Sequence, residues 1–428
     1  MEMLNKMKKI YKIAILFICT LTTSALINAS NFQLEGYPTQ GPDIDTLRSG
    51  LFFPENGKFS FMYKWFHLKD TFYKSGLVYD IDILENHPPL KYKIWLQPQP
   101  ADIVVLLPGL GTNYASLKIA AFAELFYNNG YSVLAISDSS NWEFSEAASS
   151  VLTPEFIPVD SKDIYFALTK ILNHVETTHP SRMKEKMLVG WSHGALNALF
   201  IADLESKLGD QQIGFSKYLA LNPPVNLRRG VEILDSYYKI GGKWDRKQAD
   251  VIVNKALAVI RKILSNKFDS NEKIPLTDDE ARYFIGYDFH SSLIELIYSI
   301  HMRENLGILK AQYSWFSREA LYKEIEQLNY LAYADKFLLF YYKNTYNIKM
   351  SIEEWNKASS LPAIENTLLN NDKIRVIDTQ NDFLVSDEER AWLAKTLGDK
   401  LTRLSAGGHL GYLHFKPATS LIVSKLSE

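Results

Sequence analysis

The chain has 428 residues, of which 46% are hydrophobic, and a formal net charge of −2. This length and apolar content can bury a large core, which favours one enlarged domain or a domain with a large insertion. The near-neutral charge, without a basic stripe, argues against a nucleic-acid-binding protein.

Residues 1–29 are typical of a signal peptide. Lysines are followed by residues 13–27, which are uncharged and mostly apolar, and the predicted cleavage point is Ala29, with Ala25 as a second candidate. We therefore expect a periplasmic or secreted protein whose mature chain does not insert stably into a membrane. Anchoring by an uncleaved signal is the alternative, although a membrane span needs roughly 20 residues. The only cysteine, Cys19, lies in this segment, so the mature chain is expected to form no disulfide.

An irregular extension follows the signal peptide. Residues 30–75 contain Pro38, Pro42 and Pro54, which interrupt any regular pattern, so we expect this extension to wrap the surface.

Between residues 76 and 224, runs of strand length alternate with amphipathic helical segments. Residues 103–107 are continuously apolar, as expected of a strand buried on both faces. Helices between successive strands imply a parallel sheet covered on both faces, and the first strands, which no helix separates, are expected to be antiparallel. The expected strands are 76–83, 92–96, 103–107, 131–136, 187–189 and 218–221, and the expected helices are 114–129, 160–175 and 195–201.

This alternation stops at residue 225. Residues 225–366 contain helical signals, including capping boxes at Thr277 and Ser351, and little strand signal. We expect a helical insertion over the carboxyl edge of the sheet, where ligands of such sheets bind. The alternation resumes within residues 367–428. There the expected strands are 374–377 and 401–404, and the expected helices are 386–397, which a capping box opens, and 416–427.

The segment Gly190-Trp191-Ser192-His193-Gly194 is the most informative part of the sequence. It stands between an expected strand and an expected helix, where a Gly-Xaa-Ser-Xaa-Gly pattern forms a nucleophile elbow. The turn is so tight that the flanking positions need glycine, and it exposes the serine hydroxyl above the sheet edge. A serine hydroxyl needs an adjacent base to act as a nucleophile.

With this elbow, residues 77–224 and 373–427 resemble the α/β-hydrolase superfamily. The resemblance implies a mostly parallel central sheet with helices on both faces, interrupted here by a large helical cap insertion. It also implies the chain order of an oxyanion loop, a nucleophile, an acid and a histidine.

The resemblance assigns three catalytic residues. Ser192 matches the nucleophile, and His409, in the glycine-rich loop after the last strand, matches the base that takes its proton. Asp382, in a strand-to-helix turn, matches the acid that orients the imidazole. His414 and Asp378 are the nearby alternatives.

An oxyanion hole of two backbone N–H groups is also implied by the resemblance. One is the N–H of His193, whose side chain is expected to point away, and the other belongs to the loop at residues 108–111, most directly to Leu110. Many members of the superfamily carry His-Gly in this loop. This chain has Pro108, which leaves the identity of the second donor open.

These residues predict an exported serine hydrolase that cleaves a carboxylic ester or related acyl bond in a small-molecule or lipid-like substrate. No metal and no cofactor is expected, and the oligomeric state is not predicted. An acyltransferase or serine peptidase with the same residues, or an inactive binding protein of the same fold, are the alternatives.

Two further groups of residues have both a functional and a structural interpretation. Arg228 and Arg229 either hold a substrate carboxylate or phosphate or form ordinary ion pairs. Aromatic residues of the insertion either line an acyl pocket or fill the insertion's own core. These aromatic residues are Tyr330, Tyr333, Phe337, Phe340 and Tyr341.

Overall fold

The structure is a computed structural model that describes residues 29–428 except for 53, 55–70, 210–211, 266 and 312–317. The predicted signal peptide therefore lies outside the described residues, apart from Ala29. Within the described ranges, no helix is long and apolar enough to cross a membrane.

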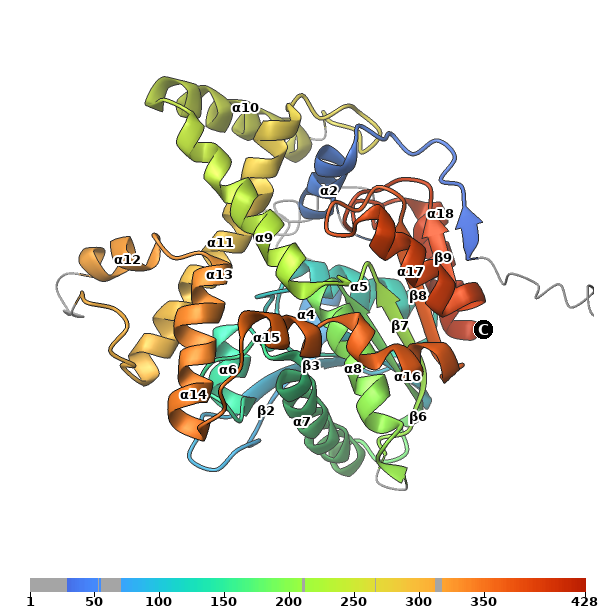
Figure 1. The fold of residues 1–428 in the computed structure, drawn as a ribbon. Helices are drawn as coiled ribbons and strands as arrows, with labels where there is room; N and C mark the ends of the chain where they lie inside the picture. Colours follow the sequence, from blue (N-terminus) through green and yellow to red (C-terminus); the bar gives the residue numbers. More distant parts are fainter. Residues whose placement is uncertain (1–28, 53, 55–70, 210–211, 266, 312–317) are drawn as a thin grey trace, which may run out of the picture.

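A nine-stranded sheet forms the centre of the molecule (Figure 1). Its strands are β1 (Ser30–Phe32), β2 (Leu77–Ile81), β3 (Leu90–Trp95), β4 (Ala101–Leu107), β5 (Ser132–Ala135), β6 (Met183–Trp191), β7 (Phe215–Leu221), β8 (Ile374–Thr379) and β9 (Leu401–Leu404). The strand order is β1-β9-β8-β7-β6-β4-β5-β3-β2. β3 runs antiparallel to both of its neighbours, β2 and β5, and the other pairs are parallel. The predicted strands and the antiparallel start of the sheet are thus confirmed.

Helices connect the strands and cover both faces of the sheet. Those of the sheet-bearing part are α2 (Pro42–Leu51), α4 (Thr71–Ser75), α5 (Leu117–Asn128), α6 (Trp142–Ala148), α7 (Ile157–Thr178), α8 (His193–Glu205), α17 (Asp387–Leu397), η5 (Gly398–Lys400) and α18 (Lys416–Ser427). Helices α7 and α8 pack in one apolar core and helices α5 and α18 in another.

Alternate residues of each central strand face these two cores. In β4, Ile103, Val105 and Leu107 belong to the core that holds α7 and α8. Val104 and Leu106, between them, belong to the core that holds α5 and α18. Because successive side chains of a strand point to opposite faces, a strand covered on both sides must be apolar throughout. This is the physical reason for the continuous apolar run in the sequence.

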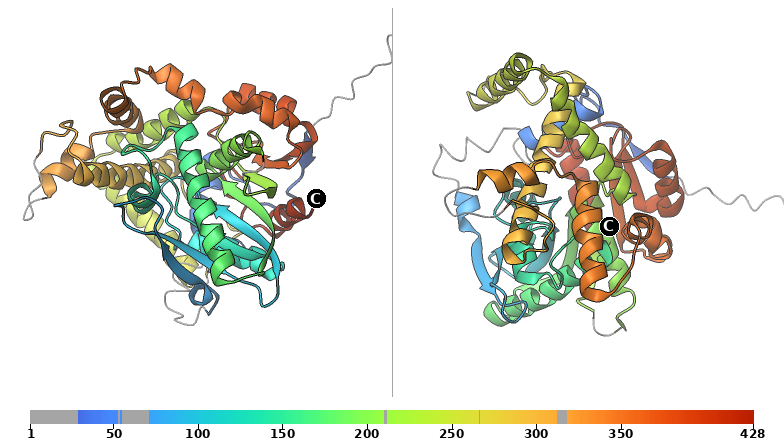
Figure 2. Two further views of the ribbon diagram at one scale, coloured as in Figure 1. Left: turned by 90° about the horizontal axis from the view of Figure 1, so that it is seen from below. Right: turned by 60° about the vertical axis from the view of Figure 1, so that its left-hand side comes forward.

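Within its described residues, the predicted insertion consists of helices joined by loops, without a strand. Its elements are α9 (Leu227–Tyr238), η2 (Lys239–Lys243), α10 (Arg246–Leu264), α11 (Asp278–Arg303), α12 (Glu319–Ile325), α13 (Tyr330–Tyr333), η3 (Ala334–Leu339), α14 (Phe340–Tyr346), α15 (Ile352–Ala358), η4 (Leu361–Ile364) and α16 (Glu365–Asn370). The capping boxes expected at Thr277 and Ser351 begin α11 and α15. The yellow and orange helices of this segment gather on one side of the molecule (Figures 1 and 2).

The described part of the N-terminal extension contains regular elements that its sequence does not predict. β1 adds a strand to the sheet beside β9, and α2 packs against α11. Pro42, predicted to interrupt a regular pattern, is instead the first residue of α2, where a missing N–H costs no hydrogen bond. Asp43 and Asp45 in the first turn complement the helix dipole.

Candidate active site

Ser192 stands in a strained turn between β6 and α8. Its backbone angles are φ 55° and ψ −122°, a conformation that non-glycine residues rarely adopt. A side chain on Gly190 would overlap the carbonyl of Gly194, and one on Gly194 would overlap the carbonyls of Leu107 and Pro108. Both glycines are therefore required for this turn to form.

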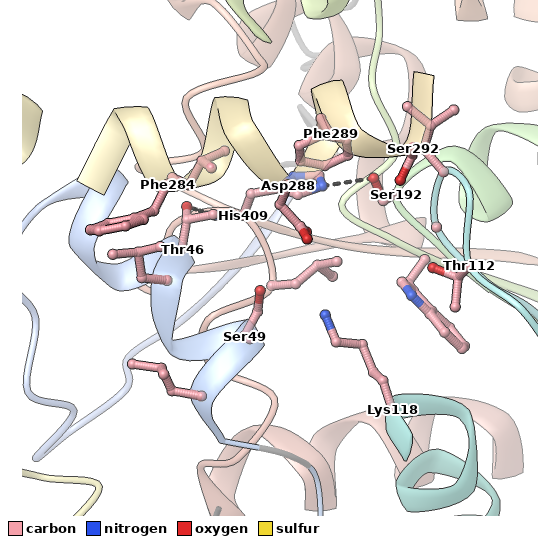
Figure 3. Close-up of a pocket in the computed structure, with 18 of the residues that line it drawn as sticks. Thr46, Ser49, Thr112, Lys118, Ser192, Phe284, Asp288, Phe289, Ser292 and His409 are labelled. Carbon is pink, nitrogen blue, oxygen red and sulfur yellow. Dashed lines mark hydrogen bonds between the residues drawn. The ribbon is translucent and has the colours of Figure 1, made fainter. Parts of the chain in front are cut away.

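The three predicted catalytic side chains lie in hydrogen-bond contact. Oγ of Ser192 is 2.8 Å from Nε2 of His409, and Nδ1 of His409 is 2.8 Å from Oδ2 of Asp382. All three residues are buried. Figure 3 shows the imidazole of His409 directed at the hydroxyl of Ser192. The arrangement lets Nε2 accept the serine proton while Nδ1–H donates to the carboxylate.

Hydrogen bonds to Asp382 favour its charged form. Its Oδ2 accepts from the amide Nδ2 of Asn222 at 2.7 Å, and its Oδ1 accepts from the N–H of Leu384 at 2.9 Å. Burial alone would raise the pKa of Asp382, but the attraction of His409 and these hydrogen bonds hold the pKa below its usual value. Asn222 in turn accepts a hydrogen bond from the hydroxyl of Tyr412.

Sequence reasoning did not identify Asn222 as a functional residue. Its one signal is its position directly after β7, the strand next to the elbow strand.

The alternative acid, Asp378, has another partner. Its carboxylate accepts hydrogen bonds from Nε and Nη2 of Arg403, the shortest of 2.6 Å. Both residues are buried, and burial raises the pKa of Asp378 despite the attraction of Arg403. The structure therefore gives Asp378 the role of neutralising a buried guanidinium.

The alternative base, His414, packs among aromatic rings. Its ring centroid lies 5.0 Å from that of Phe52 and 6.1 Å from that of Tyr37. Burial, together with the charge of Arg48, lowers the pKa of His414 to about 4.

The loop that carries His409 is held by α2 and by the turn that follows β8. The N–H of His409 donates to Oγ1 of Thr46 in α2 at 2.8 Å, and the N–H of Gly408 donates to Oδ1 of Asn381 at 2.8 Å. Nδ2 of Asn381 donates to Oδ2 of Asp45 in α2 at 3.0 Å. The extension thus helps to fix the predicted base.

Backbone N–H groups for an oxyanion lie beside Ser192. Within the described residues, the N–H groups of Leu110 and His193 donate no hydrogen bond to another protein group. The N–H of Gly111, by contrast, donates to Oδ1 of Asp138 at 3.0 Å and to Oγ of Ser140 at 2.9 Å. Gly111 is thereby excluded as the second donor.

The side chain of His193 lies in a buried cluster of charges. Its Nδ1 is 2.8 Å from Oδ2 of Asp138, and its Nε2 is 3.4 Å from Oε2 of Glu155. Burial alone would lower the pKa of His193, but the two carboxylates raise the pKa well above its usual value. The expectation that only its backbone matters was therefore incomplete, because the ring also holds the start of α8 to two loops.

These three residue types are also metal ligands, and their atoms lie within 4.8 Å of one another. A metal bonds each ligand at about 2.0–2.2 Å. The 2.8 Å contact between Nδ1 of His193 and Oδ2 of Asp138 has the length of a hydrogen bond between a charged donor and acceptor. The geometry fits an imidazolium between two carboxylates.

A cavity of about 380 Å³ contains Ser192 and His409. One wall comes from α10 and α11 of the insertion and another from α2 of the N-terminal extension. Apolar side chains of the insertion form much of its surface: Ala256, Val259, Ile260, Phe284, Ile285 and Phe289.

The aromatic residues singled out in the sequence do not line this cavity. Tyr330 and Tyr333 are buried and donate hydrogen bonds to the carbonyls of Phe289 and Pro154. Phe340 is exposed. The acyl-pocket interpretation of these aromatic residues, including Tyr333 and Phe340, is therefore wrong for this cavity, because its insertion wall comes from α10 and α11.

Arg228 and Arg229 also lie outside the cavity. Arg228 pairs with Glu232 at 2.8 Å and with Glu353 at 2.7 Å, and Arg229 lies 3.5 Å from Glu389. Ordinary ion pairs therefore account for both arginines.

No protein-family model and no curated protein sequence matches this chain. Similar solved structures include the thioesterase domain from the curacin biosynthetic pathway, at 14% identity and a TM-score of 0.38, covering 82% of this chain and 99% of that chain. Est1E from Butyrivibrio proteoclasticus is 12% identical with a TM-score of 0.38, covering 83% and 100%. An esterase of Pyrococcus furiosus is 12% identical with a TM-score of 0.40, covering 82% and 90%.

Scores this low carry no information about a substrate. The fold is instead evident in the chain itself. A mostly parallel sheet presents a serine on a strained turn between strand and helix, and the acid and the histidine follow it in the order Ser, Asp, His. This is the α/β-hydrolase fold, with a large helical insertion between β7 and β8.

Proposed function

We propose that this protein is an exported serine hydrolase that cleaves a carboxylic ester or related acyl bond through an acyl-enzyme on Ser192. One observation supports this most strongly. A serine in a strained turn contacts Nε2 of His409 at 2.8 Å, and the opposite nitrogen contacts a buried carboxylate, Asp382, at the same distance.

In the first half of the reaction, Oγ of Ser192 attacks the substrate carbonyl while Nε2 of His409 takes the hydroxyl proton. The N–H groups of Leu110 and His193 donate hydrogen bonds that stabilise the negative charge developing on the carbonyl oxygen. Asp382 stabilises the imidazolium, which then protonates the leaving alcohol as the carbonyl–oxygen bond breaks. The acyl group remains on Ser192.

In the second half, water attacks the acyl-enzyme and His409 takes its proton. The collapse of the second tetrahedral state breaks the bond to Oγ, which regains the proton from His409. The products are a carboxylic acid and the free enzyme. The apolar walls of the cavity are suited to an acyl chain.

Labelling with a fluorophosphonate tests this proposal. We expect a single adduct on Ser192, located by mass spectrometry, and none in Ser192→Ala. Loss of the nucleophile is expected to lower turnover about 10⁴- to 10⁶-fold. Ser292→Ala, which changes another serine of the same cavity, is the matched control and should still be labelled. An adduct on a different serine, or full labelling of Ser192→Ala, would refute the assignment.

We also propose that residues 1–29 direct export. Cleavage after Ala29 would leave Ser30, the first residue of β1, at the new terminus, with the pairing of β1 and β9 intact. The mass of the protein from a periplasmic or culture-supernatant fraction tests this. A mature terminus at Ser30 is expected, whereas recovery of the full chain from the membrane fraction would indicate an uncleaved anchor.

A further inference from the structure

The cavity beside Ser192 is largely apolar but contains two charged side chains. These are Lys118 near the start of α5 and Asp288 in α11. Apart from His409, they are the only ionisable groups among the described residues that line it. Figure 3 shows Nζ of Lys118 and the carboxylate of Asp288 both directed into the cavity, from different walls.

Neither group has a protein partner within the described part of the chain. The side chains of Lys118 and Asp288 form no hydrogen bond there, and no ion pair within 4.0 Å joins them to each other or to another charge. Most buried acidic residues, by contrast, accept hydrogen bonds from protein groups. Asp235, for example, accepts two backbone N–H groups, and Asp378 holds Arg403.

The surroundings of the cavity shift the pKa of both Lys118 and Asp288. Burial lowers the pKa of Lys118, which the charge of Asp288 partly offsets. Partial desolvation by the surrounding residues raises the pKa of Asp288, and the charge of Lys118 partly offsets this. The two groups therefore interact through the cavity without touching. Asp288 is exposed and Lys118 is half-buried, so water contacts both groups in the free protein. A ligand that fills the cavity displaces this water, and it is favoured when it supplies hydrogen bonds to both groups.

The charges of the pair indicate what kind of group fits between them. A ligand carboxylate would be attracted by Lys118 but repelled by Asp288, and a ligand ammonium would meet the opposite conflict. A neutral group that both accepts and donates a hydrogen bond satisfies both, because it accepts from Nζ of Lys118 and donates to the carboxylate of Asp288.

We propose that the cavity selects acyl substrates that carry such a neutral donor-and-acceptor group, a hydroxyl or a primary carboxamide, away from the scissile carbonyl. Lys118 and Asp288 bind this group between them, while the apolar walls formed by α10 and α11 hold the connecting chain. This inference rests on the proposed function, since it names the substrate class of the same site.

The test uses esters with one leaving group and one acyl chain, of several lengths, that differ only at the far end. The ends are methyl, hydroxyl, carboxamide, carboxylate and ammonium. For the wild type at the best chain length, we expect kcat/KM to be about 10-fold or more higher for the hydroxyl or carboxamide end than for the methyl end. The carboxylate and ammonium ends should be poorer than the neutral polar ends.

Single variants should shift this ranking in opposite directions. Lys118→Met leaves Asp288 alone and should make the ammonium-ended ester the preferred polar substrate. Asp288→Asn leaves Lys118 alone and should make the carboxylate-ended ester the preferred one. Each preference is measured as the ratio of kcat/KM for the polar-ended ester to kcat/KM for the methyl-ended ester with the same variant. Lys395→Met, which changes an exposed lysine of α17, is the control and should retain the wild-type ranking.

Binding measurements separate this inference from the proposed function. Calorimetry with the unreactive N-methyl amides of the same acids should give the same ranking of the five ends. If no ester is cleaved and Ser192 is not labelled, the proposed function fails, and the ranking of bound amides still decides the inference. A wild-type preference for a charged end would overturn the inference, and so would variants that weaken the binding of all five amides equally.

Discussion

The hydroxyl of Thr46 accepts a 2.8 Å hydrogen bond from the backbone N–H of His409, 363 residues further along the chain. Both residues are buried, so this N–H cannot turn to water instead. A cavity wall and the support of the proposed base therefore come from the same helix, α2, which lies in the N-terminal extension.

Loss of this hydrogen bond should affect the chemical step. Thr46→Val removes the acceptor at nearly constant volume and leaves a buried donor unsatisfied, which typically costs about 1–3 kcal/mol. We expect kcat for a short activated ester to fall about 10-fold and the unfolding midpoint to drop. Thr46→Ser keeps the hydroxyl and should restore most of kcat. Equal losses in the two variants would mean that the methyl group, not the hydrogen bond, matters.

Substitutions of Asp382 and Asp378 should have different effects on turnover and stability. Asp382→Asn should lower kcat about 10⁴-fold with a modest change in stability, because the imidazole would adopt the wrong tautomer. Asp378→Asn leaves the buried charge of Arg403 without its partner, which typically costs about 3–5 kcal/mol of unfolding free energy. Its kcat per folded molecule should stay within a few-fold of the wild type. Steady-state kinetics and chemical denaturation measure both quantities, and the reverse ranking would contradict the assignment of the acid.

Stability should depend on the protonation of His193. Its pKa is higher in the folded protein than the value of about 6.5 expected in the unfolded chain, so folding favours its protonated form. Its contribution is complete below pH ~6.5 and is lost as the pH rises through the raised pKa.

His193→Gln removes this titration, since glutamine takes up no proton. The difference in unfolding free energy between the wild type and this variant should therefore be largest below pH ~6.5 and should shrink toward alkaline pH. Urea denaturation at a series of pH values measures the difference. A difference in unfolding free energy that stays constant or increases with pH would show that His193 is not held as an imidazolium.

Acyl-chain preference should follow the residues that line the cavity. Ala256→Phe places a ring in the cavity from α10 and should lower kcat/KM for long acyl esters about 10-fold or more, while acetate esters change little. Phe340→Ala changes an exposed aromatic residue outside the cavity and should alter neither. Comparing acetate with long-chain esters tests this, and a changed preference in Phe340→Ala alone would place the acyl chain elsewhere.

Local patterns were enough to predict most of the fold. The apolar run of β4, the capping box before α17 and the glycines around Ser192 each follow from constraints within a few residues, and each element appears where the sequence indicates it. The pairing of Ser192 with His409 and Asp382 was predictable because the elbow and the chain order identify those positions together.

Other features depended on contacts between distant parts of the chain. A proline such as Pro42 can either interrupt a helix or begin one, so the sequence did not predict α2. The contact between Thr46 of α2 and His409 was therefore not predicted either. In the sequence, Asn222 is an ordinary residue at the end of a strand. Its role depends on a hydrogen bond to Asp382, which lies 160 residues further along the chain. The meeting of Lys118 and Asp288 in one cavity follows from the packing of α11 over the sheet, which no local periodicity specifies.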